Sequence, residues 1–261
     1  MSANDAGAWG SATASPAVLR AGALLDLVAR AAPRPVGLPE AATELGIPRS
    51  SVANLLAALI ELELVARTSR GVVLGHRLVE LSGYYIASFD PAQRFTEYTR
   101  SHPDAQSMTM HLARLEGLET LNVARSYGPD VITVAPRIGQ RLPANCTALG
   151  KAMLARLPDD EVLARLESHE PLPGLTPHSL TDVSAVLEDV RATRSRGFAI
   201  NDEESHAGVF GMAVAVPLSG ELVAVSSSAL KAGLDDEAKA RMLSVLREVA
   251  LAVAGEMLST G

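Results

Sequence analysis

Aromatic residues are scarce in this chain of 261 residues: they make up 3% of it, although 48% of its residues are hydrophobic. Any core must therefore be filled by alanine, valine and leucine. The single cysteine, Cys146, excludes an internal disulfide and fits a reducing cytoplasm. No apolar run reaches the length of a membrane span, and the N-terminus has neither the basic start nor the apolar centre of a signal peptide. These absences predict a soluble cytoplasmic protein with room for two domains.

A strongly basic surface is also missing. Residues 1–80 contain no lysine, and their seven arginines are balanced by seven acidic residues. The net charge of −7 therefore lies in the remaining 181 residues, which hold 16 basic and 23 acidic groups. Because the N-terminal region is neutral, binding to DNA would depend on a few placed arginines and on a dimer that doubles them.

Catalytic motifs are absent. Cys146 has no partner motif, and no serine occupies a nucleophile elbow. Gly150-Lys151 differs from a phosphate loop, because Asn145 stands where a glycine is required and Ala152 follows the lysine. The histidines show no metal-ligand spacing; they are His76, His102, His111, His169, His178 and His206. The sequence therefore predicts a protein that is not an enzyme and that needs no metal or other cofactor.

Residues 38–75 predict a helix, a tight turn, a second helix and a two-stranded wing. Gly46 ends the first helix in the left-handed conformation, where a Cβ atom would clash, and Pro48 starts the second helix. One face of the second helix is apolar at helical spacing, through Val52, Leu55, Leu56, Leu59 and Ile60. Residues 64–67 and 72–74 predict two strands around a polar turn. A helix-turn-helix with a wing is a DNA-reading module, whose second helix enters the major groove.

The opposite side of this module supplies the expected contacts with double-stranded operator DNA. The start of the second helix carries side chains that hydrogen-bond phosphates and base edges, and the wing adds two arginines. The predicted DNA-binding residues are Arg49, Ser50, Ser51, Asn54, Arg67 and Arg70. The alternative is a helical hairpin that only packs against its neighbours.

The chain divides into four parts. Residues 1–14 are small and polar and predict a disordered tail. Residues 15–76 form the winged helix-turn-helix domain, which opens with a helix capped by Ser15. The core face of that helix is expected to hold Val18, Leu24, Leu25 and Val28. Residues 77–91 predict a linker helix that stops at Asp90-Pro91. Its apolar side chains would pair with another subunit; they are Leu78, Leu81, Tyr85, Ile86 and Phe89.

Residues 92–261 predict an α+β domain of the sensor type, with its helices on one side of a sheet. Strands are expected at residues 107–112, 118–125, 131–136 and 198–201, followed by a hairpin of 211–218 with 221–228. The first of these strands should have one wet face, and residues 137–143 should form a loop. Helices are expected at residues 93–100, at 148–157, from 159 onward, at 182–196 after a Thr181 cap, and at 235–258.

Several segments resemble the IclR family of bacterial transcription regulators, over residues 15–258. The most specific are RLPANCTALGKAML and, some fifty residues later, RGFAINDEE; further support comes from GIPRSSVANLLAALIELELV and AVSSSA. The resemblance implies a winged helix-turn-helix, a linker helix and a GAF-like effector-binding domain, assembled as a homodimer or homotetramer. Asn54 departs from the family, whose members usually carry a basic residue there.

The resemblance also implies an effector site between the sheet and the helix that begins near Ala148. Free backbone N–H groups at a helix start and two serines at alternate strand positions suit an anion. The predicted effector-binding residues are Val134, Leu142, Ala148, Leu149, Asn201, Val209, Gly211, Ser226 and Ser228. Three alternatives remain open: Thr147 acts only as a helix cap, residues 226–228 are the polar face of an edge strand, and the acidic turn 202–204 is solvated.

These patterns predict a ligand-responsive transcription regulator, a repressor of a catabolic operon. Its effector is expected to be a small carboxylate with an apolar or aromatic body, such as a hydroxybenzoate, rather than a two- or three-carbon keto acid. The alternative function is a small-molecule sensor that acts through protein partners without specific DNA binding. The neutral N-terminal domain and Asn54 favour that alternative.

Overall fold

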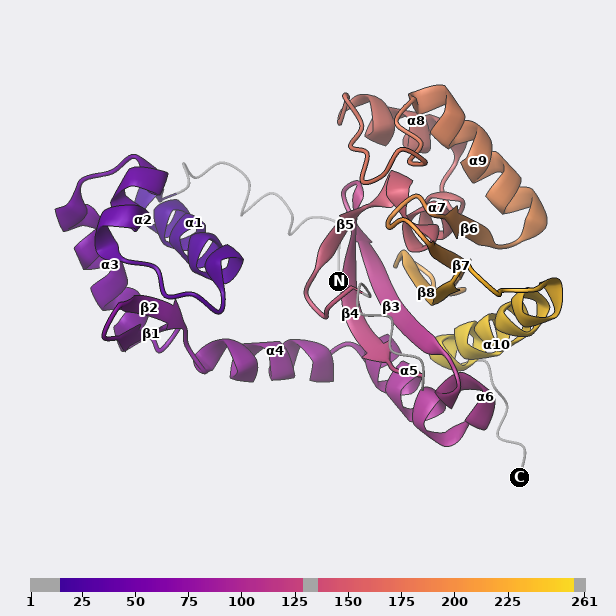
Figure 1. Cartoon of the computed structure of the whole chain (residues 1–261), viewed down its shortest axis with the longest axis horizontal. Coiled ribbons are helices and arrows are strands. Elements are labelled where there is room, and N and C mark those ends of the chain that lie inside the picture. The colour runs from indigo at the N-terminus through magenta and orange to yellow at the C-terminus, as the bar shows by residue number, and fades with distance from the viewer. Residues whose placement is uncertain (1–14, 129–135, 256–261) are drawn as a thin grey trace, which may run out of the picture. The chain divides into compact units, whose positions relative to one another are not determined.

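The computed structural model describes residues 15–128 and 136–255, and it divides the chain into two compact units between Tyr85 and Ile86 (Figure 1). The expected tail at residues 1–14, most of the expected strand at 131–136 and the last residues of the expected C-terminal helix lie outside the described residues.

The N-terminal unit contains the predicted helix-turn-helix and wing. Its elements are α1 Pro16–Ala31, α2 Leu38–Leu45, α3 Arg49–Glu61, β1 Val65–Thr68 and β2 Gly71–Leu74. Gly46 ends α2 with a φ of 62°, as the turn requires. Strands β1 and β2 pair antiparallel from Val65 opposite Leu74 to Thr68 opposite Gly71. Val36 forms an isolated bridge to Val72, which holds the wing against the segment before α2.

Two expectations for α1 are wrong. Val18 is 69% exposed, whereas Leu24, Leu27 and Val28 are buried in the core of the unit. At 3.6 residues per turn, Val18 lies about 120° around the helix from Leu24, so it misses the buried stripe. Ser15 occupies the N-cap position, but its side chain makes no capping hydrogen bond.

The predicted linker helix is shorter than expected. Helix α4 spans Arg77–Ala87 and has no buried residue among those described. Asp90-Pro91 does not stop a helix but opens the next one, α5 Asp90–Ser101, because proline is tolerated in the first helical turn. Phe89, expected on the exposed stripe of the linker, is buried in the core of the C-terminal unit.

The C-terminal unit is built on a six-stranded antiparallel sheet with the order β5-β4-β3-β8-β7-β6. The strands are β3 Thr109–Glu116, β4 Glu119–Ser126, β5 Arg141–Pro143, β6 Ala199–Asp202, β7 Val209–Ala215 and β8 Val223–Leu230. β5 lies within residues 137–143, which were expected to form only a loop. β8 lies between β3 and β7, so the interpretation of residues 226–228 as an edge strand is wrong.

Helices cover both faces of this sheet, not one (Figure 1). One face packs against α5, α6 Pro103–Gln106 and α10 Asp236–Ala254. The other face carries α7 Ala148–Leu154, with α8 Asp159–Glu167 and α9 Val183–Arg196 around it. The expected wet face of the first strand is therefore wrong, because β3 lies inside the sheet between two helical layers and most of its residues are buried.

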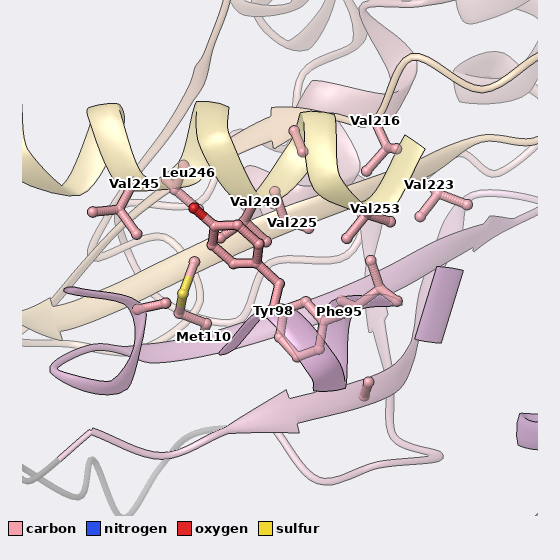
Figure 2. Packing of buried hydrophobic residues seen from close by; sticks show 14 of the residues in the cluster. Phe95, Tyr98, Met110, Val216, Val223, Val225, Val245, Leu246, Val249 and Val253 are labelled. Carbon is pink, nitrogen blue, oxygen red and sulfur yellow. The ribbon is translucent and has the colours of Figure 1, made fainter. Parts of the chain in front are cut away.

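The two faces differ in side-chain size. Large side chains from α5 and α10, including Phe95, Tyr98 and Leu246, fill the first face against Met110 and Val225 of the sheet (Figure 2). The face under α7 presents alanines, which allow close approach; they include Ala113, Ala213 and Ala224. Small residues on this side bring the start of α7 close to the strands, and the effector site was predicted there.

The helix boundaries in this unit correct two further expectations. Helix α7 ends at Leu154 rather than at residue 157. Helix α9 is capped by Asp182, whose carboxylate accepts a hydrogen bond of 3.0 Å from the Ala185 N–H, and not by Thr181. A carboxylate is favoured at the positive end of the helix dipole.

Candidate functional site

The start of α3 presents the predicted DNA-reading residues on the surface of the N-terminal unit. Arg49, Ser50 and Asn54 are exposed, and Ser51 is half-buried. The apolar face of the same helix, with Val52, Leu56 and Leu59, is buried in the core. Packing of that face fixes the direction in which the polar residues point.

The wing carries the two predicted arginines. Arg67 and Arg70 are exposed, and neither forms an ion pair within residues 15–128 and 136–255. The turn between the strands is tight, because the Thr68 hydroxyl accepts from the Arg70 N–H at 3.2 Å and donates to the Gly71 carbonyl at 3.0 Å. A Cβ at Gly71 would lie 2.3 Å from the Val36 carbonyl oxygen, so glycine is required where the wing meets the bridge. The wing thus holds Arg67 and Arg70 on a well-defined turn, with neither guanidinium in an ion pair to another described residue.

A pocket in the C-terminal unit brings together eight of the nine predicted effector-binding residues. They are Leu142, Ala148, Leu149, Asn201, Val209, Gly211, Ser226 and Ser228. The ninth, Val134, lies outside the described residues. The pocket holds about 490 Å³ of space between atoms, open solvent at its mouth included. Strands β3, β5, β6, β7 and β8, the start of α7 and the loop after β6 all contribute to its wall.

The two serines lie where alternation along β8 places them. Ser226 is buried and Ser228 is half-buried, and neither hydroxyl is hydrogen-bonded to another described residue. Gly211 pairs with Ser228 across the strands, and a Cβ there would meet the Ser228 hydroxyl at 3.4 Å. The glycine therefore leaves room directly above a free hydroxyl.

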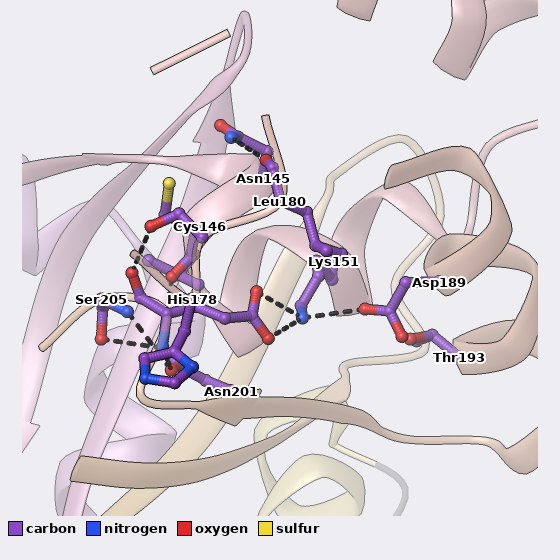
Figure 3. A network of polar contacts seen from close by, with 12 residues as sticks. Asn145, Cys146, Lys151, His178, Leu180, Asp189, Thr193, Asn201 and Ser205 are labelled. Atoms are coloured by element: carbon purple, nitrogen blue, oxygen red, sulfur yellow. Dashed lines mark hydrogen bonds and ion pairs between the residues drawn. The ribbon is translucent and has the colours of Figure 1, made fainter. Parts of the chain in front are cut away.

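Asn201 also lines the pocket, but its amide is already engaged. Its Oδ1 accepts from the Glu204 N–H at 3.0 Å, and its Nδ2 donates to the Ser205 hydroxyl at 2.7 Å and to the Cys146 carbonyl at 3.2 Å (Figure 3). These bonds tie the loop after β6 to the segment before α7. In this state Asn201 shapes the wall and offers little to a ligand.

The start of α7 is held by Thr147, whose hydroxyl accepts from the Gly150 N–H at 3.0 Å. Thr147 is therefore a helix cap, and it also lines the pocket. The N–H groups of Ala148 and Leu149 make no hydrogen bond to another described residue. Gly150 lets α7 approach the backbone at Ala144 closely, because a Cβ at this position would lie 2.2 Å from the Ala144 carbonyl oxygen.

The prediction missed several residues of the wall: His111, Pro136, Thr147, Ser205 and His206. His111 on β3 is 1% exposed and lies opposite Ser226. Burial, and to a smaller degree the charge of Arg125, lowers the pKa of His111 to about 4. The only sequence signal was its position two residues after Thr109 in an alternating segment, which was interpreted as a wet face.

Behind the pocket lies a buried charge cluster that the sequence did not predict. Lys151 on α7 is 1% exposed, and its Nζ lies 2.6 and 2.8 Å from the Glu204 carboxylate and 2.8 Å from Asp189 on α9 (Figure 3). Arg196 lies 3.3 Å from the other Asp189 oxygen. Burial raises the pKa of Glu204 despite its pairing with Lys151. The expectation of a solvated acidic turn is therefore wrong for Glu204, which is buried.

Two features that would point to other functions were not found in the part of the chain that the structure describes. No group of three or more His, Cys, Asp or Glu side chains is placed to hold a metal ion. No helix there combines the length and the apolar character needed to cross a membrane.

Both units match known protein domains. Residues 17–69 match the IclR helix-turn-helix domain, and residues 84–254 match the C-terminal domain of the bacterial transcriptional regulator IclR. The HTH-type transcriptional regulator XynR of Escherichia coli is 32% identical over 184 residues, which cover 69% of this chain and 72% of that protein.

4-Hydroxybenzoate, also called p-hydroxybenzoate, appears in the name of one similar protein and in the crystal structure of another. The p-hydroxybenzoate hydroxylase transcriptional activator of Acinetobacter baylyi is 28% identical, over 69% of this chain and 68% of its own length. The crystal structure of an IclR homolog complexed with 4-hydroxybenzoate, from Microbacterium hydrocarbonoxydans, has the same fold. Its TM-score is 0.71 at 21% identity, over 92% of this chain and 98% of that chain. The winged helix-turn-helix, the six-stranded effector domain and the matches along both units together show that this chain belongs to the IclR family of DNA-binding transcriptional regulators, which are not enzymes.

Proposed function

We propose that this protein is a ligand-responsive repressor of a catabolic operon. On α3, Arg49, Ser50, Ser51 and Asn54 contact the operator's bases and phosphates. The wing arginines Arg67 and Arg70 bind its phosphates. The exposed polar start of α3, on a helix whose other face is locked in a core, is the observation that carries the DNA-binding part of the proposal.

The DNA-binding part is tested by fluorescence anisotropy on the duplex upstream of the protein's own gene, with a scrambled duplex as control. We expect specific binding that weakens as salt rises, because arginines that neutralise phosphates release counterions. Equal affinity for both duplexes, unaffected by salt, would contradict the proposal. It would favour the alternative of a sensor that acts through protein partners.

We further propose that the active form is a homodimer or homotetramer. Helix α4 has no buried residue among those described, and it exposes two large side chains three positions apart on one face: Tyr84 is 73% exposed and Leu81 45%. A second copy of this helix would cover them. Light scattering on the full chain at micromolar concentration should return a multiple of 27.3 kDa, and a Tyr84→Ser variant should associate more weakly. A two-fold assembly also requires an approximately palindromic operator.

For the effector, we propose a small carboxylate with an apolar or aromatic body, of the hydroxybenzoate type. Ser226 and Ser228 offer free hydroxyls, whereas Leu142, Leu149 and Val209 form an apolar wall beside them. Charge-assisted hydrogen bonds to a carboxylate are roughly twice as strong as neutral ones. The two relatives connected with p-hydroxybenzoate support the same chemical class.

The effector proposal is tested by calorimetry with 4-hydroxybenzoate, benzoate, pyruvate and glyoxylate. The matched variants are Gly211→Leu, which fills the space above Ser228, and Gly211→Ala, whose Cβ would make only contacts of 3.4 Å or longer. We expect the aromatic acids to bind the wild type and Gly211→Ala, and to be rejected by Gly211→Leu. Binding of only the short keto acids, or unchanged affinity in Gly211→Leu, would contradict the pocket.

A further inference from the structure

His111 is a polar residue in the wall of the pocket that the fold itself does not use. It is 1% exposed, and its Nε2 has no hydrogen-bond partner among the residues described. Leaving a buried polar atom unpaired lowers the stability of a folded protein by about 1–3 kcal/mol. An atom of this kind in a cavity wall is complementary to a polar group of a ligand.

The backbone holds His111 in a rigid place. Strand β3 pairs with β4 on one side and β8 on the other, and His111 lies opposite Arg125 and Ser226 respectively. Opposite residues of antiparallel strands project to the same face, with their Cα atoms roughly 4.5–5.5 Å apart. The imidazole and the Ser226 hydroxyl therefore line the same pocket as neighbours.

The charges around His111 favour an anion. Arg125 is the charged neighbour on β4, and β8 contributes only serines. On α7, Lys151 is already paired with Glu204 and Asp189. His206, from the loop after β6, is the other titratable side chain of the wall. No carboxylate side chain is among the lining residues of the described chain, so a ligand carboxylate would meet no like charge there.

We propose that His111 is the specificity-determining residue of the effector pocket. Its Nε2–H donates a hydrogen bond to one oxygen of the effector carboxylate, while the Ser226 hydroxyl donates to the other. This assignment rests on the proposed carboxylate effector and names the group that recognises it.

A change of protonation follows from the contact. With a pKa of about 4, the free protein holds His111 as neutral imidazole at neutral pH, with one ring nitrogen protonated. A bound carboxylate raises the pKa of an adjacent imidazole. The complex then holds more protons than the free protein, so affinity should increase as the pH falls from 8 towards 5.5. An effector carboxyl with an ordinary pKa of about 4 stays ionised over this range.

The experiment is calorimetry on the full chain with 4-hydroxybenzoate, benzoate and phenol, in two buffers of different ionisation enthalpy between pH 5.5 and 8. His111→Leu removes the donor, His111→Gln keeps a donor that does not titrate, and His169→Leu is the control at an exposed histidine. We expect His111→Leu to weaken both acids by about 10- to 100-fold and phenol by less than about threefold. His111→Gln should retain most of the affinity and lose the proton uptake. Without ligand, His111→Leu should melt no lower than the wild type, because it removes an unpaired polar atom.

The outcomes separate the inference from the proposed function. If the wild type binds the acids and Ser226→Ala weakens them, but both His111 variants bind like the wild type, His111 has no role and the effector class stands. Proton uptake that persists in His111→Gln has the same meaning, and this readout remains if His111→Leu fails to fold. If the wild type binds phenol but neither acid, or none of the three, the carboxylate effector itself is wrong, and the role of His111 is overturned with it.

Discussion

The buried cluster of Lys151, Glu204 and Asp189 predicts a large and pH-dependent effect of one substitution. Lys151→Met would leave the Glu204 side chain, 10% exposed, without a cation. Asp189 would keep Arg196 at 3.3 Å, so the loss falls mainly on Glu204. Breaking a buried ion pair by removal of one partner destabilises a protein by about 3–5 kcal/mol, because the remaining charge stays buried and uncompensated.

The effect should depend on pH in a direction that the structure determines. Burial raises the pKa of Glu204 in the folded protein, so the folded state binds this proton more tightly than the unfolded state does. The free energy of unfolding therefore falls as the pH rises from the pKa of an ordinary glutamate through the raised pKa of Glu204. Lys151 lowers the pKa of Glu204, so removing it raises that pKa further and extends to higher pH the range over which stability falls. The deficit of Lys151→Met relative to the wild type should therefore be largest near pH 8 and shrink towards pH 5.5.

Urea denaturation of the full chain, followed by circular dichroism, measures these differences. Hydrogen exchange of peptides that cover α7 and α9 assigns the transition to the C-terminal unit. The matched control is the double variant Lys151→Met with Glu204→Leu, which removes both charges and should return to within about 1–2 kcal/mol of the wild type. Additive effects of the two single substitutions, or a deficit independent of pH, would refute the reasoning.

Three further predictions concern the DNA surface, the packing of α7 and the surface of α4. Arg49→Ala should weaken operator binding by about 1–3 kcal/mol and relax specificity at one base pair. Arg70→Ala should weaken binding to all duplexes alike and reduce the slope of log affinity against log salt concentration by about 1. Anisotropy titrations at several salt concentrations distinguish these outcomes, and identical behaviour of the two variants would contradict the assigned roles. Gly150→Ala should destabilise the protein by about 1–3 kcal/mol, because the new Cβ would lie 2.2 Å from the Ala144 carbonyl oxygen. Gly83 lies on the side of α4 away from Leu81, with no atom within 4 Å of an added Cβ. Gly83→Ala should therefore stabilise the protein by roughly 0.5–1 kcal/mol in the same urea assay, and a loss of stability would argue against an open surface on that side of the helix.

The predicted pocket residues come from distant parts of the chain, and alternation plus family resemblance placed eight of them around one cavity. His111 was missed for a definite reason. In sequence, Thr109 and His111 alternate with methionine and leucine, a pattern typical of a strand with one solvated face. Their burial depends on α7 and β8, which lie far away in sequence and which periodicity alone does not bring to β3.

The buried cluster escaped prediction for a similar reason. Lys151 and Glu204 are 53 residues apart, and each alone is typical of a solvated charge. Only the packing of α7 against α9 and the loop after β6 brings them within 2.6 Å.

Local chemistry by itself determined the helix-turn-helix, the wing and most of the strands. Gly46 adopts the left-handed conformation that ends α2, and Val52 and Leu56 recur at helical spacing on α3. Residues 69–70 form the tight turn of the wing. These preferences act within a few residues, so they can be read along the chain. The tertiary structure alone decided the strand order, the cover on both faces of the sheet and the neutral state of His111. Burial and ionisation depend on which distant elements exclude water from a residue, and that is settled only when the sheet and its helices pack.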